Sequence, residues 1–162
     1  MLFRPVLATL GYILSPDRQQ VLMIQRNKRP DDLHFGKYNG LGGRLEPHED
    51  VVSGMRREIR EESGLEAEEL VLRGTISWPG FGKNGEDWFG FIFRIERWSG
   101  QPHAGNHEGT LVWVPLAELE RLPLWPGDRY FLSMVFDDDP RAFHGCMPYQ
   151  NGQPQGWSYV RV

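Results

Sequence analysis

A glycine-rich segment that leads into an acidic helical segment constrains this chain more than any other feature. From Gly43 to Leu65 the sequence reads GRLEPHEDVVSGMRREIREESGL. Residues three and four apart share one face of a helix, so we expect Glu58, Glu61 and Glu62 within an arc of about 100°. Aliphatic residues fill the neighbouring arc. One side of the predicted helix can therefore pack on a core while the adjacent side presents three carboxylates.

Three carboxylates this close together repel one another. Near the C-terminus of a helix, negative charge also opposes the helix dipole. A bound cation would offset both effects, and hard divalent ions held by oxygen ligands suit such a site. The alternative is a solvated acidic face on an ordinary amphipathic helix.

The residues around the acidic cluster favour the metal-binding interpretation. Gly42-Gly43 lets two backbone segments approach closely, Glu49 precedes Arg57 by eight residues, and Gly64 stands where a left-handed cap would end the helix. The segment fits G-x5-E-x7-R-E-U-x-E-E-x-G-U, in which U is a bulky aliphatic residue, without a departure. It resembles the signature of the Nudix hydrolases, the MutT-like family.

The resemblance implies a fold and a chemistry. The implied fold is α+β, a Nudix-type α/β/α sandwich around a mixed β-sheet, and the implied reaction is hydrolysis of a diphosphate linkage. Mg²⁺ is the implied cofactor, with Mn²⁺ as a substitute, because such an ion neutralises phosphate oxygens and lowers the pKa of a bound water. The implied metal ligands are the carbonyl oxygen of Gly42 and the carboxylates of Glu58, Glu61, Glu62 and Glu108.

The resemblance also implies which residues carry out catalysis. Glu61 is either a further metal ligand or the base that orients the attacking water, and the choice of base is left open. Arg57 pairs with Glu49 and aims Glu58 in this scheme. Glu108, in the loop before the predicted strand 110–114, supplies the extra acid from outside the helix; without the resemblance it would be interpreted as a solvated loop residue.

Three stretches outside the acidic helix resemble the 8-oxo-dGTP diphosphatases within this family. They are Gly36–Gly43, Glu108–Pro115 and Leu124–Asp128, and a weaker match covers Phe143–Gly145. The predicted substrate is therefore a small nucleotide, 8-oxo-dGTP or dGTP, cleaved to the monophosphate and pyrophosphate. Such an enzyme removes oxidised nucleotides before they enter DNA.

The resemblance implies that Asn39, Trp125 and Asp128 recognise the base. An amide offers both a donor and an acceptor to a base edge, and an aromatic face gains about 1 to 3 kcal/mol by stacking on a base. Gly127 is a departure, because relatives carry two consecutive acids where this chain has Gly127-Asp128. Selectivity for the oxidised base is therefore open at this stage.

Further candidates carry a weaker signal. Arg26, in a basic cluster with Lys28 and Arg29, is a candidate contact for a polyphosphate, with a solvated basic loop as the alternative. Trp78 and Trp88 are candidates for the substrate pocket, with core packing as the alternative. The five histidines show no metal-site spacing, so we expect surface or structural positions for them.

Two other functions stay open. One is a Nudix hydrolase for another diphosphate, such as ADP-ribose, a dinucleoside polyphosphate or the 5′ end of RNA. The other is a nucleotide-binding module without catalysis, which the complete set of motif carboxylates disfavours.

Composition sets broader limits. At 162 residues, a single Nudix domain over residues 1–162 is expected. The net charge of -4 argues against a stable nucleic-acid partner, and no apolar run is long enough to predict a membrane segment. A single cysteine excludes an intrachain disulfide and favours a cytoplasmic location. The sequence gives no indication of the oligomeric state.

Hydrophobic patterning and turn residues predict the elements. Helices are expected at 50–63, 115–122 and 125–136, the last with Tyr130, Phe131, Met134 and Val135 buried. Strands are expected at 6–14 and 21–26 as an antiparallel pair, at 37–41, 70–78 and 110–114, at 87–98 in mid-sheet, and at 141–149 and 156–162 around a Gln150-Asn151-Gly152 turn.

Overall fold

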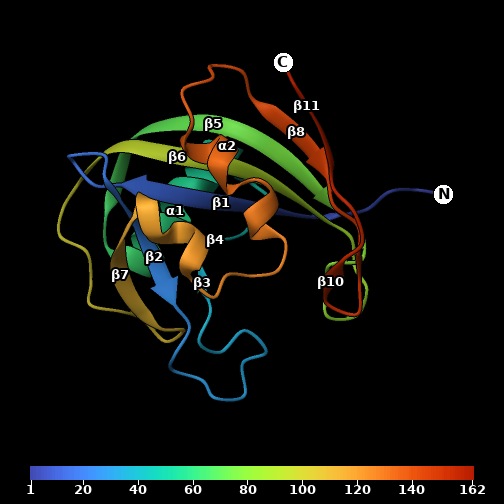
Figure 1. Ribbon diagram of the computed structural model, residues 1–162, viewed down its shortest axis with the longest axis horizontal. Helices are drawn as coiled ribbons and strands as arrows, with labels where there is room; N and C mark the ends of the chain where they lie inside the picture. Colours follow the sequence, from blue (N-terminus) through green and yellow to red (C-terminus); the bar gives the residue numbers. More distant parts are fainter.

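The computed structural model describes residues 1–162 and contains one mixed sheet of nine strands (Figure 1). A separate two-stranded hairpin lies outside this sheet. The sheet strands are β1 (Val6–Leu14), β2 (Gln20–Gln25), β3 (Tyr38–Asn39), β4 (Leu41–Arg44), β5 (Glu66–Trp78), β6 (Trp88–Ser99), β7 (Thr110–Pro115), β8 (Phe143–Cys146) and β11 (Ser158–Arg161). The hairpin consists of β9 (Tyr149–Gln150) and β10 (Gln153–Pro154).

Strand β1 brings the glycine-rich strand β4 into the middle of the sheet. On one edge, β1 runs parallel to β6 along most of its length. On the other edge, Ala8 to Gly11 pair with β4, and Ile13 and Leu14 pair with β2. The predicted antiparallel pair of β1 and β2 is confirmed, and β6 lies in mid-sheet between β1 and β5 as predicted.

Helix α1 (Val51–Ser63) covers one face of the sheet. Asp50 caps its start by accepting a hydrogen bond from the Ser53 amide at 2.8 Å, and Gly64 ends it with a φ of 79°. Met55 and Ile59 are fully buried against β1, β2 and β6 side chains. The predicted helix and its left-handed glycine cap are both confirmed.

Helix α2 (Leu132–Phe136) and the 3₁₀ turn η1 (Leu116–Arg121) contribute to the hydrophobic core on the opposite face, and a second 3₁₀ turn, η2 (Asp128–Tyr130), precedes α2. The sandwich predicted from the sequence is therefore present. None of the helices is long and apolar enough to span a membrane.

The prediction of one helix over 125–136 is wrong. Gly127 disfavours a helix, and Phe131, with a φ of -122°, separates η2 from α2 where its ring enters the core. Tyr130 is 51% exposed and so is not on the buried side, whereas Phe131, Met134 and Val135 are buried as expected. The predicted helix at 115–122 is present as the 3₁₀ turn η1.

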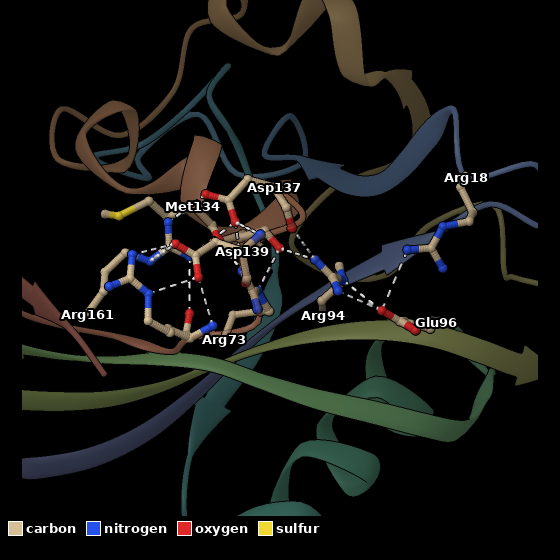
Figure 2. A network of polar contacts seen from close by, with 10 residues as sticks. Arg18, Arg73, Arg94, Glu96, Met134, Asp137, Asp139 and Arg161 are labelled. Carbon is tan, nitrogen blue, oxygen red and sulfur yellow. Dashed lines mark hydrogen bonds and ion pairs between the residues drawn. The ribbon is translucent and has the colours of Figure 1, made fainter.

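A buried arginine anchors α2 to the sheet. Arg73 on β5 is 2% exposed and donates hydrogen bonds to the carbonyl oxygens of Met134, Val135 and Asp139 at 2.9–3.2 Å. It also pairs with the Asp137 carboxylate at 2.9 Å. Figure 2 shows this network between α2 and the sheet, with Arg94 and Arg161 contributing further contacts. Arg73 thus satisfies carbonyl groups that the end of a short helix leaves unpaired.

The C-terminal segment forms shorter strands than predicted. Asn151 and Gly152, with φ values of 52° and 76°, make the expected hairpin turn between β9 and β10. The predicted strands 141–149 and 156–162 are present only in part, as β8 and β11, which pair antiparallel. The chain leaves the sheet before Pro148, which has no amide hydrogen to donate. The Tyr149 amide then donates to the Pro79 carbonyl at 2.7 Å, so the hairpin lies beside the β5–β6 loop (Figure 1).

Two other strand boundaries differ from the predictions. Strand β5 begins at Glu66 rather than residue 70, because its acidic start pairs with Arg60 and Arg97 on neighbouring elements. The predicted strand 37–41 is interrupted at Gly40, where a Cβ atom would lie 2.8 Å from the Gly11 carbonyl oxygen.

Candidate active site

A cavity of about 220 Å³ opens beside the first half of β1. Its lining combines two groups of side chains, one acidic and next to β4, the other aromatic. The lining includes Thr9, Arg26, Asn39, Gly42, Gly43, Glu62, Trp78, Phe81, Trp88, Glu108, Trp125, Asp128 and Tyr149. Seven of the residues predicted for metal or substrate therefore share one cavity: Arg26, Asn39, Gly42, Glu62, Glu108, Trp125 and Asp128.

Glu62 is the most buried carboxylate of α1. Its Oε2 accepts a hydrogen bond from the Gly42 amide at 3.0 Å, which ties the end of the helix to β4. Burial first, and then the nearby charges of Glu108 and Glu58, raise the pKa of Glu62 to about 9. Acidic groups are thus crowded at this point of the cavity, and a bound cation would favour their charged form.

The two glycines of β4 make room for this arrangement. A Cβ atom on Gly43 would lie 2.6 Å from Oε1 of Glu58, so only glycine lets that carboxylate rest against the strand. A Cβ atom on Gly42 would overlap the backbone carbonyl of Thr9 on β1. Glu58 therefore packs on β4 at the side of the cavity, where burial raises its pKa.

Arg57 connects the carboxylates outside the cavity. It donates to Glu49 at 2.6 and 2.9 Å, to Glu58 at 3.0 Å and to Glu61 at 3.2 Å. The Arg57 guanidinium lowers the pKa of Glu49 to about 2. The Glu61 side chain is 59% exposed and does not line the cavity. The expected contact of Arg57 with Glu49 is present, and the structure separates Glu61 from Glu62.

The loop before β7 holds Glu108 close to the end of α1. The Asn106 side chain accepts hydrogen bonds from the amides of Glu108 and Gly109 and donates to the Glu62 carbonyl at 3.0 Å. Sequence reasoning missed Asn106, although an Asn two residues before an acid is typical of a turn in which the side chain binds the backbone. Arg26 pairs with Glu108 at 3.3 Å and with Asp32 at 2.6 Å.

The acidic group fits a hard divalent cation in its chemistry. All its donors are oxygens, and buried carboxylates that repel one another gain from a positive ion. No three acidic, histidine or cysteine side chains converge into a preassembled metal centre. Glu58 instead turns to Arg57, Glu62 to the Gly42 amide and Glu108 to Arg26.

The aromatic group surrounds the other part of the cavity. Phe81 lies edge-on to Trp88 and to Tyr149, with ring centroids 5.7 and 5.1 Å apart. Trp125 lies 5.8 Å from Phe81, and His34 stacks on Trp125 at 4.1 Å without lining the cavity. His34 thus has a structural role, and Trp78 and Trp88 line the cavity together with Trp125.

Three buried polar atoms among the cavity residues have no hydrogen-bond partner in the protein. They are Oγ1 of Thr9, Nε1 of Trp125 and Oδ1 of Asn39, whose Nδ2 is already used to donate to the Gly40 carbonyl at 2.7 Å. An unpaired buried polar atom costs about 1 to 3 kcal/mol, so all three atoms favour a ligand with complementary groups. Sequence reasoning missed Thr9, for which only the isolated hydroxyl in an apolar strand was a signal.

Asp128 lies buried among aromatic residues. No protein side chain or amide donates a hydrogen bond to its carboxyl, and burial raises its pKa to about 7, against the opposing charge of Arg129. Burial and the charge on Asp128 raise the pKa of the Tyr12 and Tyr149 hydroxyls, which lie nearby. At neutral pH the carboxyl is therefore available both as donor and as acceptor.

The helix-covered mixed sheet, and the motif carboxylates packed on a glycine strand, agree with the fold and the acidic motif expected from the sequence. The NUDIX domain family model matches residues 4–135. The chain belongs to this family, among its MutT-like members.

Relatives of the chain agree with this assignment. An oxidized purine nucleoside triphosphate hydrolase of Mus musculus is 30% identical over 145 residues, which cover 90% of this chain and 87% of the mouse protein. An uncharacterized Nudix hydrolase of Bacillus subtilis is 28% identical over 141 residues, covering 85% and 83%. The crystal structure of a MutT protein from Bacillus halodurans has a TM-score of 0.82 at 24% identity, covering 95% and 97%, and shows a shared fold.

Proposed function

We propose that this Nudix hydrolase is a Mg²⁺-dependent pyrophosphohydrolase that cleaves 8-oxo-dGTP, or dGTP, to the monophosphate and pyrophosphate. The observation that carries the proposal is the cavity, because its acidic and aromatic groups match the two parts of a nucleotide. A triphosphate with its metal needs oxygen ligands, and a base needs aromatic faces and a few polar groups. The similarity to the mouse hydrolase of oxidized purine nucleoside triphosphates supports this choice.

In this proposal the carboxylates on α1 and in the loop before β7 hold the metal. Glu58, Glu61, Glu62 and Glu108, with the carbonyl oxygen of Gly42, are the ligands. Bound Mg²⁺, or Mn²⁺ in its place, neutralises phosphate oxygens and lowers the pKa of a bound water. The Arg57 ion pairs keep Glu58 and Glu61 in position, so that one of the two can accept the proton of the attacking water.

The aromatic group is assigned to the base. Trp125 offers a ring face, and Oδ1 of Asn39 offers an unpaired acceptor for an N–H group on the base edge. Asp128 offers either a donor or an acceptor near neutral pH. Arg26, which already pairs with Glu108, is assigned to the phosphates.

The proposal extends to the whole chain and its biological setting. Strands β8 and β11 lie beyond the matched residues 4–135 but join the main sheet, which supports a single domain over 1–162. Removal of oxidised nucleotides from the pool, and so protection of DNA, is the proposed role. The cytoplasmic location expected from the single cysteine belongs to this proposal as well.

A hydrolysis screen tests this function. Purified protein with Mg²⁺ is incubated with 8-oxo-dGTP, dGTP, ADP-ribose, a dinucleoside polyphosphate and RNA carrying a 5′ triphosphate or cap. The highest kcat/KM is expected for the purine triphosphates, with none of the activity left in excess EDTA. A preference for ADP-ribose, dinucleoside polyphosphate or RNA would assign another substrate, and binding without metal-dependent hydrolysis would indicate a non-catalytic role.

A further inference from the structure

Tyr149 reaches the cavity from a part of the chain that lies beyond the match to the family model. It stands on β9, in the hairpin beside the β5–β6 loop (Figure 1). Its amide donates to Pro79, and its ring lies edge-on to Phe81 at 82° and 5.1 Å. Contacts on both backbone and ring therefore fix the direction of the Tyr149 hydroxyl.

Residue 127 is a glycine, and the Tyr149 hydroxyl occupies the space that a side chain there would need. A Cβ atom built on Gly127 would overlap this hydroxyl and the sulfur of Met147. Residue 127 therefore has no room for a side chain unless Tyr149 and Met147 move. The polar group at this place comes from β9 instead of from residue 127.

Tyr149 and Asp128 bring two polar groups to the same cavity. The Asp128 carboxyl has no hydrogen-bond partner among the side chains, and the Tyr149 hydroxyl interacts only with the backbone amide of Gly127, which leaves its own hydrogen free to donate. The two groups lie close to each other, because the Tyr149 hydroxyl lies against Gly127, the residue before Asp128, and both residues line the cavity. Tyr149 stays protonated, so it can always donate one hydrogen bond.

We propose that the Tyr149 hydroxyl, together with the Asp128 carboxyl, hydrogen-bonds to the polar edge of a purine base. Tyr149 is then a specificity-determining residue of the site. This inference rests on the proposed function, because it takes a purine nucleotide as the ligand. The phenol donates to a keto oxygen or ring nitrogen, while Asp128 serves as acceptor or donor beside it.

Replacing Tyr149 by phenylalanine tests the inference, because the ring and its contact with Phe81 are kept and only the hydroxyl is lost. KM for 8-oxo-dGTP should rise about tenfold, the effect of one lost hydrogen bond, with kcat within about twofold of the wild type. The kcat/KM for dCTP, which lacks a purine edge, should change by less than about twofold. Tyr159→Phe on the exposed strand β11 is the matched control and should change neither value.

The outcomes separate this inference from the proposed function. If the wild type hydrolyses 8-oxo-dGTP and Tyr149→Phe matches it in KM, the inference is overturned and the proposed function stands. If the wild type neither binds nor hydrolyses any purine triphosphate, the proposed function fails and the inference falls with it. Equal losses on 8-oxo-dGTP and dCTP with a lowered melting temperature would show a packing role and overturn the inference.

A double-mutant cycle with Gly127 provides a second test. Gly127→Ala should displace the Tyr149 hydroxyl and raise KM for 8-oxo-dGTP about as much as Tyr149→Phe does. Because both changes remove the same hydrogen bond, the double variant should show little further loss, within about twofold of either single variant. If KM of the double variant rose by the product of the two single increases, the two changes would not remove the same hydrogen bond.

Discussion

Among single side chains, Glu62 is expected to matter most for turnover. Its carboxylate is buried against the Gly42 amide, whereas Glu61 is exposed on the same helix. Glu62→Gln keeps the shape and the hydrogen bond to Gly42 but removes the charge that would hold the metal. The kcat with saturating Mg²⁺ should fall at least about 100-fold, while the melting temperature changes little.

Glu66→Gln is the control for this change. Glu66 is an exposed glutamate that pairs with Arg60 away from the cavity, so its loss should leave kcat unaltered. Turnover close to the wild type in Glu62→Gln would remove Glu62 from the metal site.

Asp128 should make the stability of the metal-free protein depend on pH. Its pKa is raised from an ordinary 3.8 to about 7 by burial. A carboxyl whose pKa is higher in the folded than in the unfolded protein stabilises the folded state when it is protonated. This stabilisation is fully present below the pKa of the unfolded state and is lost as the pH rises through the pKa of the folded state. Between pH 5 and pH 8 the free energy of unfolding should therefore fall more in the wild type than in Asp128→Asn. Denaturant titrations with the same pH dependence in both proteins would show that Asp128 is not buried as described.

Within β4, the two glycines should respond differently to alanine. A Cβ atom on Gly43 meets the movable carboxylate of Glu58, so Gly43→Ala should lower kcat about tenfold or more with little loss of stability. A Cβ atom on Gly42 meets the backbone of β1, so Gly42→Ala should lower the free energy of unfolding by about 2 kcal/mol or more. Kinetics and thermal melts of both variants check this contrast. A larger loss of stability in Gly43→Ala than in Gly42→Ala would contradict the described packing.

The attachment of α2 to the sheet depends on Arg73. Arg73→Met leaves three carbonyl groups and the Asp137 carboxylate without this partner (Figure 2). The free energy of unfolding should fall by about 3 kcal/mol or more, because breaking a buried ion pair strands its partners. Arg97→Met, which removes the exposed ion pairs of Arg97 with Glu68 and Glu69, should cost about 0.5 kcal/mol or less. If chemical denaturation showed the same loss in the free energy of unfolding for both variants, the burial of Arg73 would contribute nothing to stability.

Elements with strong local signals could be predicted from the sequence, and elements set by distant contacts could not. Helix α1 carries its own caps, Asp50 and Gly64, and an apolar stripe, so its boundaries were correct within one residue. The segment 125–136 has a helical pattern as well, but buried Phe131 and the anchor at Arg73 divide it. Long-range packing overrode the local preference there.

Across the whole molecule, the sheet joins residues that the sequence keeps far apart. The acidic group could be predicted because Glu58, Glu61 and Glu62 belong to one short pattern. Thr9 and Tyr149 could not, because they meet the cavity only through the pairing of β1 with β4 and the placement of the C-terminal hairpin. Motif residues thus indicated the chemistry, and the fold added Thr9 and Tyr149 to the lining of the cavity.

The central claim is that one cavity binds an oxidised purine triphosphate and cleaves it with Mg²⁺. The most direct test is chromatographic analysis of the products formed from 8-oxo-dGTP, with Mg²⁺ and with excess EDTA, beside the same reaction on dGTP. We expect 8-oxo-dGMP and pyrophosphate in equal amounts, only when Mg²⁺ is present. Release of orthophosphate alone, product formation in EDTA, or no cleavage of either nucleotide would contradict the account.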